Sequence, residues 1–385
     1  MMMKKLIRYA AVAAGAATLA AGALAADLKV GLSVSLSGPN SSLGIPYSKG
    51  MQAALAYLPV VAGHKVQLIV LDDGSDPTTA GRNARKLIEE DKVDVIMGTS
   101  GVPSAMAMAQ VAKEDKTPMI GLTPISPTPN PWVVTVAQPT QLMVDAVVER
   151  MKRNGVKTVG YIGFSDAWGD LVYSALMKAA PAAGIKVVSN ERYARTDQSV
   201  TGQALKIVAL HPDAVMTGGA GTPGALPFLA LADLGYKGGL YGQHGLINPD
   251  FIRVAGASAN GALMPTGPVI VAGQLPANYP TKQIALTFRK VYQQVNHAPS
   301  TDAFSAYSFD GWLVFADAAK RALAASHAQP GTPAFRTALR DAIVNTKEVV
   351  GTHGVYNFKP GEIYGVDRRA RVIVKLDHGK WQLAP

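Results

Sequence analysis

The stretch VQLIVLDDGSDP, residues 66–77, contains the unit from which this chain is built. Val66–Leu71 is an apolar run of the kind found in buried strands, and a polar turn follows it. At the end of the turn, Asp76 can cap a helix and Pro77 can occupy its first turn. The residues beyond Pro77 place one apolar face on that helix: Ala80, Ala84, Leu87 and Ile88. The stretch therefore predicts a strand, a turn and an amphipathic helix in succession.

The same order of elements recurs along the chain. Other strands are expected at Leu28–Val34, Val93–Met97, Met119–Leu122, Val156–Ile162, Lys186–Ser189, Ala214–Thr217 and Gly239–Gly242, and in the tail from Gly354 to Leu383. Helices are expected near Ser48–Tyr57, Gln141–Asn154, Gly169–Ala183, Thr201–Leu210, Gly224–Leu234, Lys282–Val295, Ser305–Ala325 and Pro333–Asn345. Strands that alternate with helices imply parallel sheets covered on both faces. Because a second series of similar length starts near Leu142, the sequence predicts an α/β fold of two doubly wound lobes joined by short crossovers.

The N-terminus has the pattern of a cleavable export signal. Lys4, Lys5 and Arg8 precede an apolar run that reaches about Gly22, and Ala23-Leu24-Ala25 then offers a cleavage site before Ala26. A retained N-terminal anchor is the alternative, but the run is short and rich in alanine for a membrane span. We therefore expect residues 1–25 to be a signal peptide and the mature protein to be soluble in the periplasm.

The composition is that of a globular protein. Hydrophobic residues make up 48% of the chain, and no later apolar stretch is long enough to cross a bilayer. The roughly 360 residues left after cleavage exceed what one core usually organises, which again favours two lobes. The chain has no Cys, so disulfides, thiolate chemistry and lipid attachment at the cleavage site are excluded.

The basic charge does not indicate nucleic-acid binding. The formal net charge is +10, and removing the three basic residues of the signal leaves +7. The densest basic group, Arg368-Arg369-Arg371, lies in a strand-like segment, and no basic helix is interleaved with stacking aromatics. We expect a solvated basic surface and no nucleic-acid partner.

Candidate ligand contacts follow the strands, because ligands bind at the carboxyl ends of strands in open α/β sheets. After Val93–Met97, Ser100, Gly101 and Val102 lead into a helix whose free N–H groups can hold an anion, although ordinary helix capping explains them equally well. Thr123 and Ile125 form a similar edge after the next strand. In the second series, Trp168 lies at a strand-to-helix turn, where stacking on a ligand and packing in the core are both open.

Two further strand ends of the second series are rich in glycine. Ala220 and Gly221 follow one strand, and Gly242 to Gly245, which include His244, follow the next. Glycine allows the backbone to approach a ligand closely. These loops therefore complete the set of candidate contacts.

Enzymatic and metal-binding motifs are weak or missing. The sequence has no G-x-S-x-G, H-E-x-x-H or P-loop pattern, and its histidines lack metal-ligand spacing. Asp72, Asp73 and Asp76 resemble the start of a calcium loop, but the later Gly and Glu are missing, so turn formation and capping explain them better. We expect no cofactor, no metal and no enzymatic activity; a periplasmic hydrolase stays open as an alternative.

The chain resembles the branched-chain amino-acid-binding (Leu/Ile/Val-type) family of periplasmic solute-binding proteins, which have the type I two-lobe fold. The residues that carry the resemblance are Val34 to Pro39, Leu71 to Asp73 with Asp76-Pro77, Val93 to Ile96 with Gly98, Trp168-Gly169, and Gly351 through Phe358 to Gly361. It implies that one small solute is bound between lobes that close on it and is delivered to an ABC-type permease. The expected N-terminal lobe comprises residues 26–140 and 267–350, and the C-terminal lobe residues 141–266 and 351–385.

The resemblance also implies the site. The first-lobe contacts of the family map to Ser100, Gly101, Val102, Thr123 and Ile125, where backbone N–H and hydroxyl groups hold the ligand carboxylate. The aromatic residue that closes over the ligand maps to Trp168. A second aromatic position of that lobe is Ala220 here, and a first-lobe tyrosine position is Leu43. Both changes remove bulk, which implies a differently shaped and larger cavity.

His244 is the departure that matters most. Relatives that bind amino acids have a carboxylate at this position, which pairs with the α-ammonium of the ligand. A His can act as a donor or a cation but not as an anion. Because burying an unpaired ammonium costs several kcal/mol, we expect a ligand without one, such as an aromatic or aliphatic carboxylate. Asp166 could instead substitute for the missing acid.

We therefore expect a monomeric periplasmic protein that binds a small organic solute and delivers it to a membrane permease. Amino-acid binding, and ligand sensing for a membrane receptor, are the alternatives that the sequence leaves open.

Overall fold

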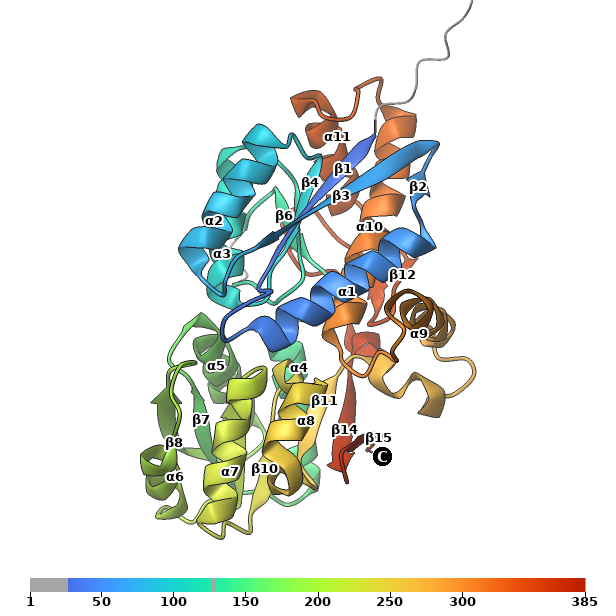
Figure 1. Cartoon of the computed structure of the whole chain (residues 1–385). Coiled ribbons are helices and arrows are strands. Elements are labelled where there is room, and N and C mark those ends of the chain that lie inside the picture. Colours follow the sequence, from blue (N-terminus) through green and yellow to red (C-terminus); the bar gives the residue numbers. More distant parts are fainter. Residues whose placement is uncertain (1–26, 127–128, 385) are drawn as a thin grey trace, which may run out of the picture.

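The computed structural model describes residues 27–126 and 129–384. The expected export signal and its cleavage site before Ala26 lie outside the described residues. The chain forms two α/β lobes stacked end to end, and each lobe contains one large sheet with helices on both faces (Figure 1). The predicted fold class, two α/β lobes with doubly wound and mainly parallel sheets, is confirmed.

The first lobe contains a six-stranded sheet of order β2-β3-β1-β4-β5-β6. Its strands are β1 (Leu28–Val34), β2 (Val60–Val61), β3 (His64–Asp72), β4 (Val95–Gly98), β5 (Met119–Gly121) and β6 (Val133–Thr135). Only the β2–β3 pair is antiparallel. In β1 every residue except Lys29 is buried, as expected for a strand with helices on both faces of its sheet. The order reverses at β1, so the loops after β1 and β4 diverge and leave room for a ligand.

The second lobe contains a seven-stranded sheet of order β15-β14-β11-β10-β9-β7-β8. Its strands are β7 (Thr158–Phe164), β8 (Lys186–Tyr193), β9 (Ala214–Gly218), β10 (Gly239–Tyr241), β11 (Leu263–Thr266), β14 (Val372–Asp377) and β15 (Lys380–Leu383). The strands β7 to β11 pair in parallel, whereas β14 and β15 are antiparallel additions at the edge. Here the order reverses at β7.

The helices of the first lobe are α1 (Ser41–Tyr57), α2 (Pro77–Arg85), α3 (Val102–Glu114), α9 (Lys282–Asn296), α10 (Phe304–Ala325) and α11 (Pro333–Val344). Asp76 accepts a hydrogen bond from the backbone N–H of Thr79 at 2.7 Å, which confirms that it caps α2. Helices α2 and α3 cover one face of the sheet, and α1 and α10 cover the other (Figure 1). Gly50 of α1 allows the close contact with α10, because a Cβ there would lie 1.9 Å from the carbonyl oxygen of Ser305.

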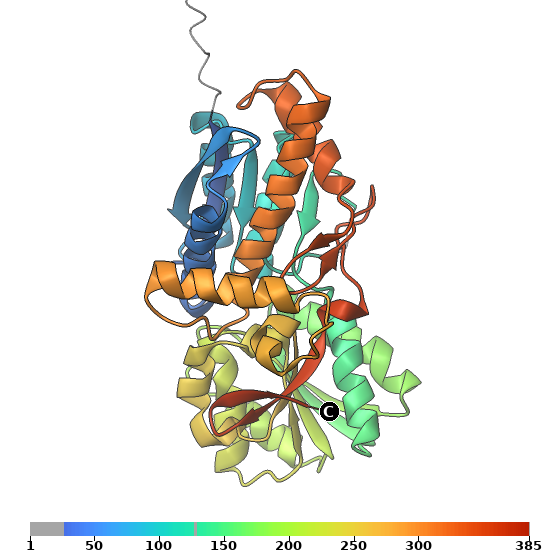
Figure 2. The same cartoon turned by 90° about the vertical axis from the view of Figure 1, so that its right-hand side faces the viewer.

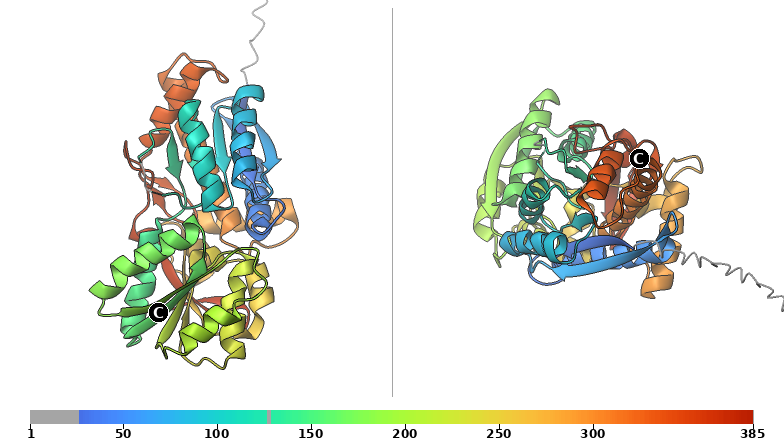
Figure 3. Two further views of the ribbon diagram at one scale, coloured as in Figure 1. Left: turned by 90° about the vertical axis from the view of Figure 1, so that its left-hand side faces the viewer. Right: turned by 90° about the horizontal axis from the view of Figure 1, so that it is seen from above.

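The helices of the second lobe are α4 (Thr140–Arg153), α5 (Ala167–Ala182), α6 (Thr201–Val208), α7 (Leu226–Asp233) and α8 (Pro249–Ala255). The pair α4 and α5 lies on one face of the sheet, and α6 to α8 lie on the other (Figure 3). No helix within residues 27–126 and 129–384 is long and apolar enough to cross a membrane.

The chain passes between the lobes three times: between β6 and α4, between β11 and α9, and before β14. The third passage comes later than the sequence suggested. Residues 351–364 lie with the first lobe and include β13 (Val355–Tyr356), which pairs with β12 (Val349–Val350). Tyr356 donates a hydrogen bond to Val136 O at 3.0 Å, and Tyr364 forms a β-bridge with Thr135. The expected return to the second lobe at residue 351 is therefore wrong. Tyr356 is fully buried and anchors the segment to the first core.

Candidate functional site

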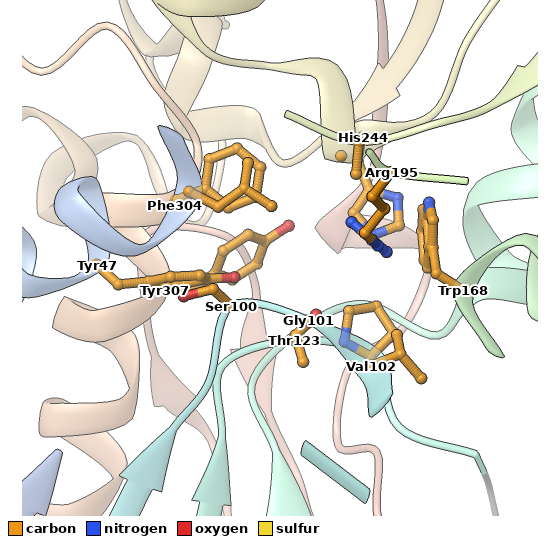
Figure 4. Close-up of a pocket in the computed structure, with 14 residues that line it drawn as sticks. Tyr47, Ser100, Gly101, Val102, Thr123, Trp168, Arg195, His244, Phe304 and Tyr307 are labelled. Atoms are coloured by element: carbon orange, nitrogen blue, oxygen red, sulfur yellow. The ribbon is translucent and has the colours of Figure 1, made fainter. Parts of the chain in front are cut away.

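A cavity lies between the lobes, at the carboxyl ends of the strands on either side of the two order reversals. Seven of the nine candidate residues line it: Ser100, Gly101, Val102, Thr123, Trp168, Ala220 and His244 (Figure 4). Two do not. Ile125 is buried in the first lobe beside Tyr364, and Gly221, with φ of +60°, faces Ser42 and Leu43 across the lobe boundary.

A buried carboxylate shapes the first-lobe side of the cavity. Asp73 accepts hydrogen bonds from the Ser35 hydroxyl at 2.6 Å and from the Thr99 hydroxyl. The Ser35 backbone N–H in turn donates to the Ser100 hydroxyl at 2.9 Å. These bonds join the loops after β1, β3 and β4 and place Ser100 and Gly101 directly before α3. The first-turn N–H groups of α3 have no partner within the helix, so this edge suits an anionic group of a ligand.

Three aromatic residues that the sequence analysis did not select form the first-lobe wall: Tyr47, Phe304 and Tyr307. Tyr47 of α1 donates a hydrogen bond to Leu122 O at 2.7 Å and meets Phe304 edge-on, with ring centroids 5.5 Å apart. Tyr307 stacks on His353 with centroids 3.8 Å apart, and its hydroxyl donates to Gln138 near the first crossover. Burial raises the pKa of both tyrosines well above its usual value, so they stay neutral.

Trp168 closes the second-lobe side from the first turn of α5. Asp166 caps this helix by accepting hydrogen bonds from the backbone N–H groups of Trp168 and Gly169 at 2.9 and 3.2 Å. The indole N–H of Trp168 points toward Gly219 O at 3.3 Å. Only 3% of Trp168 is exposed and its ring lines the cavity, so its position fits both roles that the sequence left open, packing in the core and contact with a ligand.

His244 lies in a 3₁₀ turn after β10 and meets Trp168 edge-on, with ring centroids 5.3 Å apart. Both ring nitrogens are buried, and neither has a hydrogen-bond partner among the described residues. Burial lowers the pKa of His244 to about 4. The ring is therefore neutral near pH 7, with one donor and one acceptor available to a ligand. With no anion bound, burial thus disfavours the cationic form of His244 that the sequence left open.

Arg195 is the only charged side chain among the described residues that line the cavity. Its guanidinium forms an ion pair with Asp166, Nε to Oδ2 at 2.6 Å, and donates from Nη1 to the Asn40 amide oxygen at 2.8 Å. Asn40 belongs to the first lobe, so Arg195 connects the lobes. The backbone N–H of Thr222 makes a second connection with the Ser42 hydroxyl at 3.1 Å. The lobes are thus closed on each other.

The closed cavity is narrow. Its volume is about 20 Å³, room for about one or two water molecules. Leu43 and Ala220 line it together with Tyr47, Phe304 and Trp168, and the larger cavity expected from these two small side chains stays a prediction. A ligand with a ring must therefore enter with the lobes apart and shift these side chains on closure.

The described residues offer no metal site. No group of three or more His, Asp or Glu side chains in residues 27–126 and 129–384 can hold a metal ion. The three aspartates that resembled a calcium loop instead accept hydrogen bonds within the loops. Asp72, for example, accepts from the backbone N–H of Leu36 at 2.8 Å.

Comparison with known proteins identifies the family. A family model described as periplasmic binding protein matches residues 27–358. This chain is a periplasmic binding protein.

The resemblance to Leu/Ile/Val-type binding proteins is also confirmed. Leu/Ile/Val-binding protein homolog 3 of Brucella melitensis is 26% identical over 259 residues, which are 63% of this chain and 68% of the relative. An extracellular ligand-binding receptor from Rhodopseudomonas palustris has 42% sequence identity and a TM-score of 0.89, and the match covers 94% of this chain and 100% of that one. An ABC transporter solute-binding protein of R. palustris in complex with benzoate has a TM-score of 0.78 at 23% identity, over 93% and 95% of the two chains, and shows the fold alone.

The binding protein thus takes its cavity residues from many separate segments. Arg195 was not among the expected contacts, although it follows the end of β8 at the same sheet edge as Trp168. Phe304 and Tyr307 begin α10, some 180 residues after Thr123. Two aromatic residues three positions apart at a helix start would have been the only signal, and such pairs usually belong to a core.

Proposed function

We propose that this protein binds a small organic carboxylate, aromatic or aliphatic and without an α-ammonium, between its two lobes and delivers it unchanged to a membrane permease. The observation that carries the proposal is the charge of the cavity lining. Among the described residues that line it, none is Asp or Glu. A cationic ammonium would therefore be buried without a partner, whereas a carboxylate has N–H donors at the start of α3.

Asp166 offers little to an ammonium. Its Oδ1 accepts two backbone N–H groups of α5, and its Oδ2 accepts from Arg195. A ligand ammonium could use this carboxylate only if it displaced Arg195, which would then lose its own ion pair. Removing one partner of a buried pair costs about 3–5 kcal/mol, and less where water reaches it. The ion pair thus supports a ligand that needs no acid.

The apolar part of the ligand would contact aromatic rings. Trp168 and His244 lie on one side, and Tyr47 and Phe304 lie on the other. A flat ring or a branched chain fits such a lining, with the neutral His244 as a hydrogen-bond partner. A protein of the same fold binds benzoate, which is compatible with this ligand class.

Matched ligand pairs test the proposal. The compounds 3-phenylpropanoate and phenylalanine differ only in the α-ammonium, as do 4-methylpentanoate and leucine. After removal of any co-purified ligand by unfolding and refolding, at least one acid without the ammonium should raise the melting temperature, since a bound ligand stabilises the folded state. Its amino-acid counterpart should bind at least about 100-fold more weakly, because its ammonium would be buried without a partner.

The opposite result would refute the carboxylate assignment. If leucine or phenylalanine gives the large shift and its counterpart gives none, the site binds amino acids and another group replaces the missing carboxylate. Chemical change of the bound compound, followed by NMR of the ligand, would overturn delivery without reaction.

Export to the periplasm, cleavage before Ala26 and action as a monomer complete the proposal. The mass and N-terminal sequence of the protein recovered from the periplasm test the cleavage. Loss of uptake of the identified acid on deletion of the gene would support transport, whereas intact uptake would favour a sensing role.

A further inference from the structure

A second pocket, separate from the cavity between Trp168 and Tyr47, has a volume of about 400 Å³. Five parts of the chain line it: α8, the segment after β11, α9, the loop before α10 and the β14–β15 hairpin. These parts contribute Ile252, Ile270, Arg289, Gln293, Ser300, Lys380 and Trp381. Helix α9 packs on α1 of the first lobe, whereas the hairpin belongs to the second sheet. Figure 2 shows this side of the molecule, with α9 lying across it above the hairpin. The pocket therefore lies between parts of both lobes.

The pocket has positive charge and no acid to balance it. Arg289 and Lys380 line it, no Asp or Glu does, and neither cation forms an ion pair within the described part of the chain. Within the described part of the chain, the Arg289 guanidinium donates one hydrogen bond, from Nη2 to Ile270 O at 2.7 Å. Burial lowers the pKa of Arg289, as expected for a charge held away from water without a counter-ion.

Trp381 adds a donor without an acceptor. Its indole N–H is buried and has no hydrogen-bond partner among the described residues. Arg, Lys and the Trp indole can donate hydrogen bonds but cannot accept them. A group that contacts both Arg289 and Lys380 must be an acceptor, and their two positive charges favour an anion. The indole ring, Ile252, Ile270 and Pro299 supply apolar surface next to these donors.

We propose that this pocket is a second binding site, which takes an organic anion with an apolar body. The anionic group contacts Arg289 and Lys380, and the apolar body lies against Trp381. The site is independent of the ligand proposed for the cavity between the lobes.

The indole N–H signals of the four tryptophans allow a direct test by two-dimensional NMR. The signal of Trp381 is assigned with Trp381→Phe, and that of Trp168 reports separately on the cavity between the lobes. The probe is benzenesulfonate, and benzenesulfonamide, which has the same ring without the charge, is the matched control compound. Benzenesulfonate should shift the Trp381 signal to saturation, and the sulfonamide should bind at least 10-fold more weakly.

Two variants separate a built site from nonspecific attraction. Arg289→Gln and Lys380→Gln should each weaken benzenesulfonate binding at least 10-fold at Trp381. Lys380 is exposed, so its replacement carries little risk to folding, and unchanged signals of the other tryptophans show that Arg289→Gln is folded. Arg253→Gln, an exposed arginine of α8 that pairs with Asp250, is the control and should bind as the wild type does. A Trp381 signal that does not saturate, that responds equally to the sulfonamide, or that is unaffected by both variants overturns the proposal.

Discussion

The buried, unpartnered ring of His244 makes the stability of this protein depend on pH in a direction that can be tested. Burial lowers the pKa of His244 to about 4 in the folded state, against about 6.5 in the unfolded chain. Between pH 6.5 and 4 the unfolded chain therefore binds a proton that the folded protein does not. Stability falls as pH falls through this window. At pH 5 the contribution is a loss of about 2 kcal/mol relative to pH 7.

Two other buried groups modify the total. Burial lowers the pKa of His353 to about 3, so this residue adds a loss of about 2 kcal/mol at pH 5. Asp310 acts in the opposite direction, because burial raises its pKa to about 6 and protonation in the folded state restores about 1 kcal/mol between pH 7 and pH 5. These three groups together predict a net loss of about 3 kcal/mol.

The variant His244→Gln isolates the contribution of one residue. Urea unfolding at pH 7 and pH 5, with ligand removed, should show a loss for the variant that is smaller than the wild-type loss by about 2 kcal/mol. His327→Gln makes the same change at an exposed position and should keep the wild-type difference. In parallel, the NMR signal of the His244 ring should stay at its neutral position down to pH 5. Equal losses for wild type and His244→Gln would refute the buried neutral ring.

Three further predictions concern the cavity and the core. Trp168→Ala should weaken binding of the identified acid by about 1–3 kcal/mol, measured by calorimetry, and unchanged affinity would leave the ring a purely structural role. Asp166→Asn keeps an acceptor for the α5 cap but frees Arg195 from its counter-ion, so affinity for a carboxylate should rise and should fall more steeply with added salt; loss of affinity would contradict this. Gly50→Ala should lower the melting temperature, because the added Cβ would lie 1.9 Å from the α10 backbone. Gly81→Ala in α2 is the control: no atom lies nearer than 4.0 Å to the added Cβ, so this variant should be neutral or more stable by about 0.4–1 kcal/mol. Equal effects of the two substitutions would argue against the close contact of α1 with α10.

Apolar runs predicted most of the elements, and prolines account for two of the misses. The bounds of β1 agree with the expected Leu28–Val34 because the whole run is buried by helices on both faces. Helix α1 begins seven residues before the expected Ser48 and runs through Pro46, a residue that ordinarily ends or kinks a helix and so hid the first turns. Strand β11 was missed because Pro265 interrupts it, although it pairs with β10 and β14. The strand β6 is only three residues long, too short for a period to show.

The sequence predicted cavity residues only where they directly follow a strand. Ser100, Thr123 and His244 follow strands, and the rule that ligands bind at the carboxyl ends of strands brought them together. Tyr47 and Tyr307 lie within helices, where an aromatic residue looks the same whether it faces a core or a cavity. Only the packing of α1 against α10 decides that these rings reach the cavity.

The charge of the lining also depends on contacts that no local pattern contains. Asp166 and Arg195 are 29 positions apart, yet their ion pair at 2.6 Å joins the acid that caps the helix of Trp168 to the one charged side chain among the described residues that line the cavity. With this pair formed, His244 has no acid beside it that would hold a proton on its ring, and burial alone sets its neutral state. The preference for a ligand without an ammonium thus follows from two linked facts: the acid of the second lobe is already engaged, and the residue at the end of β10 cannot replace it.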